Sequence, residues 1–266
     1  MNENFRTAKW SDPVFEIPNV RFLTFYSAAI KGRGDVTLYL PDDYEELEDL
    51  PLIVLLHGVK ASHWSWVFQG GAHLVAQSLI ENEEIPPCIM AMPSDGMWGD
   101  GSGYYRHDGL HYENWIVRDL LGILEEELDC ITEHSSRFLC GLSMGGLGAF
   151  RLGAKFPELF QGISAHSPLT QYRQLVDLVE DLATSALPPE ADQNPIYWMR
   201  QNKNKLPPIR FDCGMNDRFI DANRDFHRRL NNEGIPHEYE EFPGEHNWEY
   251  WNEHLADSLR WFLEDL

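Results

Sequence analysis

Basic residues are scarce in this chain. Its 266 residues include 21 Lys and Arg against 43 Asp and Glu, which gives a formal net charge of −22. A surface with this charge repels the phosphates of nucleic acids and the headgroups of anionic lipids. Nucleic-acid binding and membrane-surface functions are therefore disfavoured, and polyanionic substrates are mildly disfavoured. The simplest role of the charge is to keep the protein soluble.

The sequence also lacks long apolar runs. No run is long enough to cross a bilayer, and Met1 to Pro13 are polar, without the apolar core of a signal peptide. We therefore expect a cytoplasmic protein. Cysteine is rare as well: Cys88, Cys130, Cys140 and Cys213 are scattered, with neither a CxxC motif nor a spacing that suggests metal binding. Buried, reduced thiols are the expectation.

The length and the apolar pattern predict one α/β domain over residues 1–266. Residues 20–40 have the pattern of a β-hairpin, with a turn at 31–34. Continuous apolar runs, typical of parallel strands covered on both faces, follow at residues 52–56, 88–92, 137–140, 162–165 and 209–213. Helical stripes lie between and after them, at residues 116–124, 219–230 and 248–262. This alternation predicts a mostly parallel sheet with helices on both faces and an N-terminal antiparallel hairpin. Residues 167–206 form a longer excursion, placed where it could cap the active edge.

The strongest chemical signal is Gly-Leu-Ser-Met-Gly-Gly at 141–146, which matches G-x-S-x-G. An apolar strand precedes it and a helix rich in small residues follows it, so Ser143 is expected at a sharp, strained strand-to-helix turn. Gly141 and Gly145 suit this turn because the two backbones nearly touch there. We therefore predict that Ser143 is a nucleophile, which requires a base because a serine hydroxyl is weakly nucleophilic at neutral pH.

Asp217 is the best-placed acid for this serine. It follows the predicted strand at 209–213, and the order Ser, Asp, His is that of this strand–turn–helix motif. Asp212 lies within the strand and Asp221 within the next helix, so both are weaker candidates. The structural alternative for Asp217 is an N-cap for the helix that starts at Phe219.

His246 is the predicted base. It lies between a predicted last strand, at 237–242, and the C-terminal helix, where a loop can bring the imidazole over the serine while Asp217 holds its other nitrogen. His254 falls within the helix and is the weaker candidate. The oxyanion donors are expected to be the backbone N–H groups of Val59, in the loop after the strand at 52–56, and of Met144.

Substrate contacts are harder to predict. Trp98 and Tyr104 lie in a loop of glycine and aspartate that follows the strand at 88–92, where they either form a wall of the site or belong to ordinary turns. Trp64 lies near the oxyanion loop, and Trp248 follows His246 closely. His107 and His111 have a spacing that can bind a metal on a helix, but solvated or helix-capping roles are the simpler interpretation.

Four segments together resemble the esterase family of the α/β-hydrolase superfamily: LLHG at 55–58, GLSMGG at 141–146, CGMND at 213–217 and PGEHNWEYW at 243–251. This family includes esterase D, S-formylglutathione hydrolases, tributyrin esterases, feruloyl and acetylxylan esterases, and mycolyltransferases. The resemblance covers roughly the whole chain. It implies an α/β-hydrolase fold, a two-step acyl-enzyme mechanism, the same triad and oxyanion donors, and no cofactor or metal.

The resemblance implies a serine carboxylesterase for short acyl or carbohydrate-linked esters. The loop at 59–62 lacks the cysteine found in S-formylglutathione hydrolases, which weakens the interpretation as a thioesterase of that kind. An acyltransferase with the same triad, or a binding protein on an inactive scaffold, would also be compatible with these motifs. A small ester is the expected partner, without nucleic acid or membrane, and a homo-oligomer stays open.

Overall fold

The computed structural model describes residues 4–183, 186–264 and 266. The first three residues of the polar N-terminus and residues 184–185 of the 167–206 excursion lie outside the described residues. The strands are β1 (Phe5–Trp10), β2 (Val20–Ser27), β3 (Gly32–Tyr39), β4 (Leu52–Leu56), β5 (Ile89–Pro93), β6 (Arg106–His107), β7 (Leu110–His111), β8 (Arg137–Leu142), β9 (Gly162–His166), β10 (Ile209–Gly214) and β11 (Glu238–Phe242). The α-helices are α1 (Ser65–Phe68), α2 (Ala72–Glu81), α3 (Tyr112–Asn114), α4 (Leu121–Glu127), α5 (Met144–Lys155), α6 (Tyr172–Val176), α7 (Pro195–Gln201), α8 (Ile220–Glu233) and α9 (Trp248–Leu263). Four 3₁₀ segments and one π-helical segment complete the elements of the described residues. The 3₁₀ segments are η1 (Pro13–Phe15), η2 (Tyr44–Glu46), η4 (Glu180–Ala183) and η5 (Glu190–Asp192), and the π-helical segment is η3 (Trp115–Leu120).

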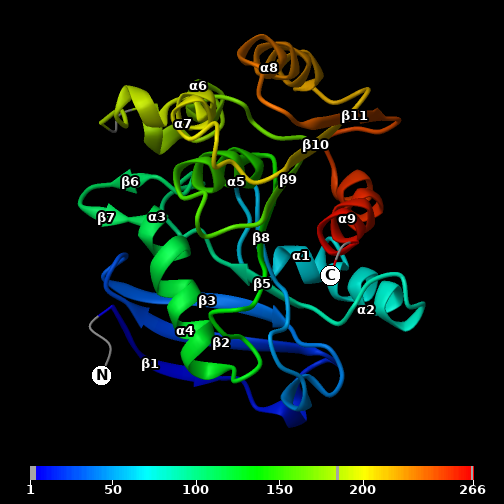
Figure 1. Ribbon diagram of the computed structural model, residues 1–266. Coiled ribbons are helices and arrows are strands. Elements are labelled where there is room, and N and C mark those ends of the chain that lie inside the picture. The colour runs from blue at the N-terminus through cyan, green and yellow to red at the C-terminus, as the bar shows by residue number, and fades with distance from the viewer. Residues whose placement is uncertain (1–3, 184–185, 265) are drawn as a thin grey trace.

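One sheet carries the order β1-β2-β3-β5-β4-β8-β9-β10-β11 within the described residues. Its first part is antiparallel, from β1 to the pairing of β3 with β5. From β5 to β11 every pairing is parallel. Figure 1 shows the blue antiparallel strands at one end of the twisted sheet. The predicted parallel sheet with an antiparallel N-terminal hairpin is confirmed, and the sequence analysis missed β1.

The predicted hairpin turn at 31–34 is wrong by three residues. The chain turns at residues 28–31, and β3 already begins at Gly32. Gly34 is therefore a strand residue, and its role is close packing: a Cβ there would lie 2.4 Å from Cη2 of Trp115. A glycine in a strand interior often marks such a close approach, which the sequence pattern does not separate from a turn.

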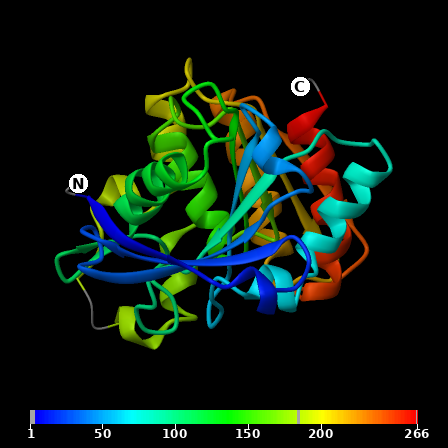
Figure 2. The same cartoon turned by 90° about the horizontal axis from the view of Figure 1, so that it is seen from below.

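The sheet separates two apolar layers. Along β4 the side chains alternate, so that Leu52, Val54 and Leu56 join one buried cluster while Ile53 and Leu55 join the other. Helices α4, α5, α7 and α8 contribute to the first cluster, and α1, α2 and α9 cover the opposite face. Figure 2 shows this three-layer arrangement, with red α9 and cyan α2 on one side of the sheet and the green helices on the other. Each central strand is thus buried on both faces, as continuous apolar runs predict.

The excursion at 167–206 packs beside α5. The side-chain amide of Asn202 donates to the carbonyl of Ala154, near the end of α5, and Tyr105 donates its hydroxyl to the carbonyl of Asp192. Helices α6 and α7 lie next to α8 in Figure 1. Across the described residues, no helix combines the length and the apolar character that a membrane span requires.

Candidate active site

Ser143 occupies a strained turn between β8 and α5. Its backbone has φ 52° and ψ −116°, a region that residues other than glycine rarely adopt. The Ser143 N–H donates to the carbonyl of His166 at 3.0 Å, and the Ser143 carbonyl accepts the Leu169 N–H at 3.0 Å. Both bonds connect the turn with the end of β9 and the residues that follow it. The Ser143 hydroxyl stands at the carboxyl edge of the parallel strands.

Two glycines permit this turn. A Cβ on Gly145 would lie 2.1 Å from the carbonyl oxygen of Leu56, and a Cβ on Gly141 would lie 2.2 Å from that of Gly145. Both contacts are with backbone, which cannot swing aside as a flexible side chain can. The requirement for small residues two positions before and after Ser143 is therefore met by direct backbone contact.

The imidazole of His246 connects Ser143 with Asp217. Its Nδ1 lies 2.7 Å from Oδ2 of Asp217, so the proton on Nδ1 is donated to the carboxylate. Nε2 is then free to accept the Ser143 hydroxyl, whose Oγ is 3.0 Å away. The rings of Phe219 and Trp251 contact the imidazole edge-to-face at 5.1 and 5.0 Å, which restricts its orientation.

Asp217 is buried and carries two hydrogen bonds from the protein. Oδ2 faces His246, while Oδ1 accepts the backbone N–H of Phe219 at 2.8 Å. Burial alone would raise the pKa of Asp217, but these bonds outweigh it and hold the pKa below its ordinary value. The two roles weighed for Asp217, partner of the histidine and cap of the following turn, are thus compatible in one carboxylate.

The loop after β4 lies against the serine. A Cβ on Gly58 would be 3.4 Å from Cβ of Ser143, and Val59 lines the same cavity. The buried side chain of His57 fixes this loop: Nε2 accepts the Asp95 N–H at 3.0 Å, so Nδ1 donates to the Gly58 carbonyl at 2.8 Å. Sequence reasoning considered only the backbone here and missed the imidazole that positions it.

A cavity of about 410 Å³ opens over Ser143. It is lined by Gly58, Val59, Lys60, Ala61, Gln69, Leu142, Ser143, Arg218, His246, Asn247, Trp248 and Trp251. The lining thus combines the rings of Trp248 and Trp251 with several polar side chains, as a site that must orient a small molecule requires.

Of the four predicted substrate contacts, Trp248 lines this cavity, and the other three lie elsewhere. Tyr104 is fully buried and donates its hydroxyl to the carbonyl of His57, so it is a packing residue. Trp98 stacks on His107 at 4.3 Å, and Trp64 is partly exposed outside the lining. His107 is buried rather than solvated, because this stack and a 2.6 Å contact with the Ser102 carbonyl enclose it.

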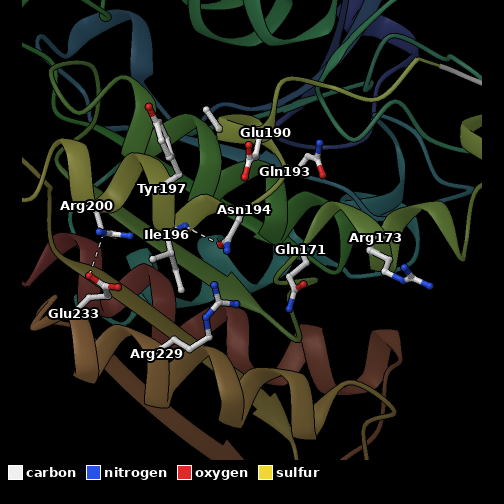
Figure 3. A pocket seen from close by; sticks show the side chains of 11 residues that line it. Gln171, Arg173, Glu190, Gln193, Asn194, Ile196, Tyr197, Arg200, Arg229 and Glu233 are labelled. Carbon is white, nitrogen blue, oxygen red and sulfur yellow. Dashed lines mark hydrogen bonds and ion pairs between the residues drawn. The ribbon is translucent and has the colours of Figure 1, made fainter.

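The larger cavity, of about 700 Å³, is remote from this chemistry. It lies between α8 and the excursion and contains three arginines, Arg173, Arg200 and Arg229. Figure 3 shows Arg229 reaching from α8 towards Asn194, and Arg200 paired with Glu233 at 3.2 Å. Described residues of the 167–206 excursion line this cavity, and none of them lines the one at Ser143. The cap-like role of the excursion stays a prediction.

Residues 27–262 match the model of the family described as "Putative esterase". The chain belongs to this esterase family. An acetyl esterase from Caldicellulosiruptor saccharolyticus is 26% identical, over 90% of this chain and 96% of that protein. A solved ferulic acid esterase matches with a TM-score of 0.78 and 24% identity, over 93% of this chain and 98% of its own. The S-formylglutathione hydrolase of Staphylococcus aureus matches with a TM-score of 0.76 and 19% identity, over 97% and 99% of the two chains.

These similarities confirm two predictions made from the sequence. The structural matches confirm the α/β-hydrolase fold, and membership of the family confirms a serine ester hydrolase. The similarities assign no role to an individual residue and do not identify the ester. The contacts and the charge of the site bear on both.

This esterase contains a second, buried Ser–His–Asp arrangement. His166 Nδ1 lies 2.8 Å from Oδ2 of Asp212, and His166 Nε2 lies 3.0 Å from Oγ of Ser258. Arg210 and Tyr250 also donate to Asp212, both at 2.9 Å. His166, Asp212 and Ser258 are fully buried, so no substrate reaches them. Asp212, the rival considered for the acid, therefore belongs to a structural network that joins β9, β10 and α9.

The network favours the protonated form of His166. Burial alone would lower its pKa, but the Asp212 carboxylate raises the pKa to about 10. Both ring nitrogens then donate, Nδ1 to Asp212 and Nε2 to Ser258. A histidine in this state cannot accept a proton from serine.

This protonation predicts a pH-dependent contribution to stability. The folded protein holds a proton that the unfolded chain releases near pH 6.5, so the stabilisation is complete below that pH and is lost as pH rises towards 10. The difference in unfolding free energy between wild type and His166→Gln should therefore be larger at about pH 6 than at about pH 9.5. Urea denaturation of both proteins measures this difference, and a value independent of pH would contradict the protonated imidazole.

Proposed function

We propose that this protein is a carboxylesterase that hydrolyses short acyl or carbohydrate-linked esters through an acyl-enzyme on Ser143. The observation that carries the proposal is the continuous hydrogen-bonded chain from Ser143 Oγ through His246 to Asp217, at a strained turn beside a cavity. The related acetyl esterase and ferulic acid esterase carry names that fit these two substrate classes. The cavity volume of about 410 Å³ lies within the ordinary range for sites that bind small molecules.

The geometry supports the following steps. His246 Nε2 takes the proton from Ser143 as Oγ attacks the ester carbonyl, and Asp217 stabilises the imidazolium that forms. The N–H groups of Val59 and Met144 stabilise the tetrahedral oxyanion. Val59 lies in the loop that His57 holds in place, and Met144 begins α5. His246 then protonates the leaving alcohol, and water cleaves the acyl-enzyme by the reverse sequence.

Two measurements test this proposal together. A fluorophosphonate probe should label Ser143 in wild type but not in Ser143→Ala, as intact and peptide masses would show. Wild type should hydrolyse p-nitrophenyl acetate and butyrate faster than the octanoate if short acyl groups are its substrates. Labelling without hydrolysis would direct the search to acetylated and feruloylated sugars. Absence of both labelling and hydrolysis in folded protein would overturn the proposal.

A further inference from the structure

The charge of the cavity at Ser143 is opposite to that of the whole protein. The chain carries 43 acidic and 21 basic residues, yet the described residues that line the cavity include Lys60 and Arg218 and not one carboxylate. A cavity lined at random on this surface would be acidic. Two cations beside the serine therefore create a local positive potential, which attracts an anion against the field of the molecule.

Arg218 is available to bind such an anion. Its guanidinium lies 4.8 Å from the ring of Phe219, and within residues 4–183, 186–264 and 266 it forms no ion pair. Arg224, in the next helix, differs: it donates to both carboxylate oxygens of Glu241, at 2.9 and 2.7 Å. The planar fork of Arg218 thus retains the geometry that recognises a carboxylate through two parallel bonds.

Lys60 lies on the oxyanion loop, directly after Val59. Its backbone N–H donates to the carbonyl of Asp100 at 2.7 Å, and its φ of 58° fixes a tight turn. Its ammonium is 3.5 Å from an Asp100 oxygen, in a pair whose side chains are 65% and 49% exposed. Exposed pairs of this kind are weak, and the ammonium keeps further donors for a ligand.

We propose that the site selects esters that carry one carboxylate, which Arg218 and Lys60 bind while Trp248 and Trp251 contact the apolar part. This inference rests on the proposed function and names its substrate class. A single anionic group is compatible with the surface charge, since two nearby cations offset the repulsion that a polyanion would meet. Arg218 and Lys60 are thus specificity-determining residues, and the bond-making groups remain those of the triad.

Matched ester pairs test the proposal. On the acyl side, p-nitrophenyl hydrogen adipate is compared with p-nitrophenyl hexanoate, and on the alcohol side, 3-acetoxybenzoate is compared with 3-acetoxybenzamide. The quantity measured is the ratio of kcat/KM for the charged ester to that for the neutral one, which cancels any general loss of activity. We expect wild type to favour the charged ester about tenfold in one of the two pairs, which also reveals the side that carries the charge.

Arg218→Gln and Lys60→Gln should lower this ratio, and the double variant should bring it close to one. Arg224→Gln is the matched control, because it removes an arginine that is paired outside the cavity. A wild-type ratio near or below one in both pairs, or a ratio unchanged in the double variant, would overturn the inference. If neutral esters are still hydrolysed and Ser143 is still labelled, the proposed function stands without it.

Discussion

Replacing Ser143 with alanine should lower kcat by roughly 10⁵- to 10⁶-fold, whereas Ser258→Ala should leave kcat near that of wild type. Each serine lies 3.0 Å from Nε2 of a histidine whose Nδ1 faces an aspartate. The two differ in their surroundings: His246 Nε2 faces Ser143 beside an open cavity, while His166 is buried and the Asp212 carboxylate raises its pKa, which favours the protonated form. We therefore expect the same connectivity to give a nucleophile at Ser143 and a hydrogen-bond acceptor at Ser258.

Steady-state hydrolysis of p-nitrophenyl butyrate by both variants measures this contrast. Circular dichroism and a denaturation midpoint for each protein establish that Ser143→Ala is folded. Comparable losses of kcat in the two variants would mean that the buried network contributes to catalysis directly. Full activity in Ser143→Ala would remove the proposed nucleophile.

Substitutions of the two aspartates should likewise differ in their effects on kcat and on stability. Asp217→Asn should lower kcat about 10⁴-fold with little effect on stability, because the amide can donate to Nδ1 and so stabilises the wrong tautomer of His246. Asp212→Asn should instead lower the free energy of unfolding by about 3–5 kcal/mol, because it leaves buried His166 without its carboxylate and leaves Arg210 with Glu240 alone. The kcat of the fraction that remains folded should stay near the wild-type value.

Urea titrations and initial rates on both variants, with the active fraction counted by fluorophosphonate labelling, test this pair of effects. If Asp212→Asn lowered kcat per labelled site as strongly as Asp217→Asn, the network would be coupled to the triad through Tyr250 and α9. If Asp217→Asn retained most of its activity, another group would orient His246.

The sequence predicted the parts of this site that depend on chain order. Ser143, Asp217 and His246 each follow a strand of a parallel sheet, and the carboxyl ends of such strands meet at one edge, so their approach could be foreseen. The side chains around them depend on where loops fold in three dimensions. Tyr104 illustrates this limit: its loop passes the site, but its ring turns into the core beneath α5.

The sequence analysis missed other residues of the site for the same reason. Arg218 and Lys60 were not singled out because an isolated basic residue in an acidic sequence has no pattern of its own. Gln69, directly after α1, and Trp251, in α9, line the cavity. No local motif encodes how these two helices pack against the far face of the sheet. His57 was considered for the backbone that follows it, although a histidine beside a glycine after a buried strand was a usable signal.

The backbone contacts around Gly141 and Gly145 also bear on how such an enzyme can evolve. Any substitution at either glycine drives a side chain into a main-chain carbonyl, so substitutions are strongly disfavoured at the positions that shape the turn at Ser143. Lys60 and Arg218 are exposed residues of loops, where changes have little effect on folding. With the roles proposed above, reaction chemistry and substrate choice lie on separate sets of residues, so the preferred ester can change during evolution without a loss of stability.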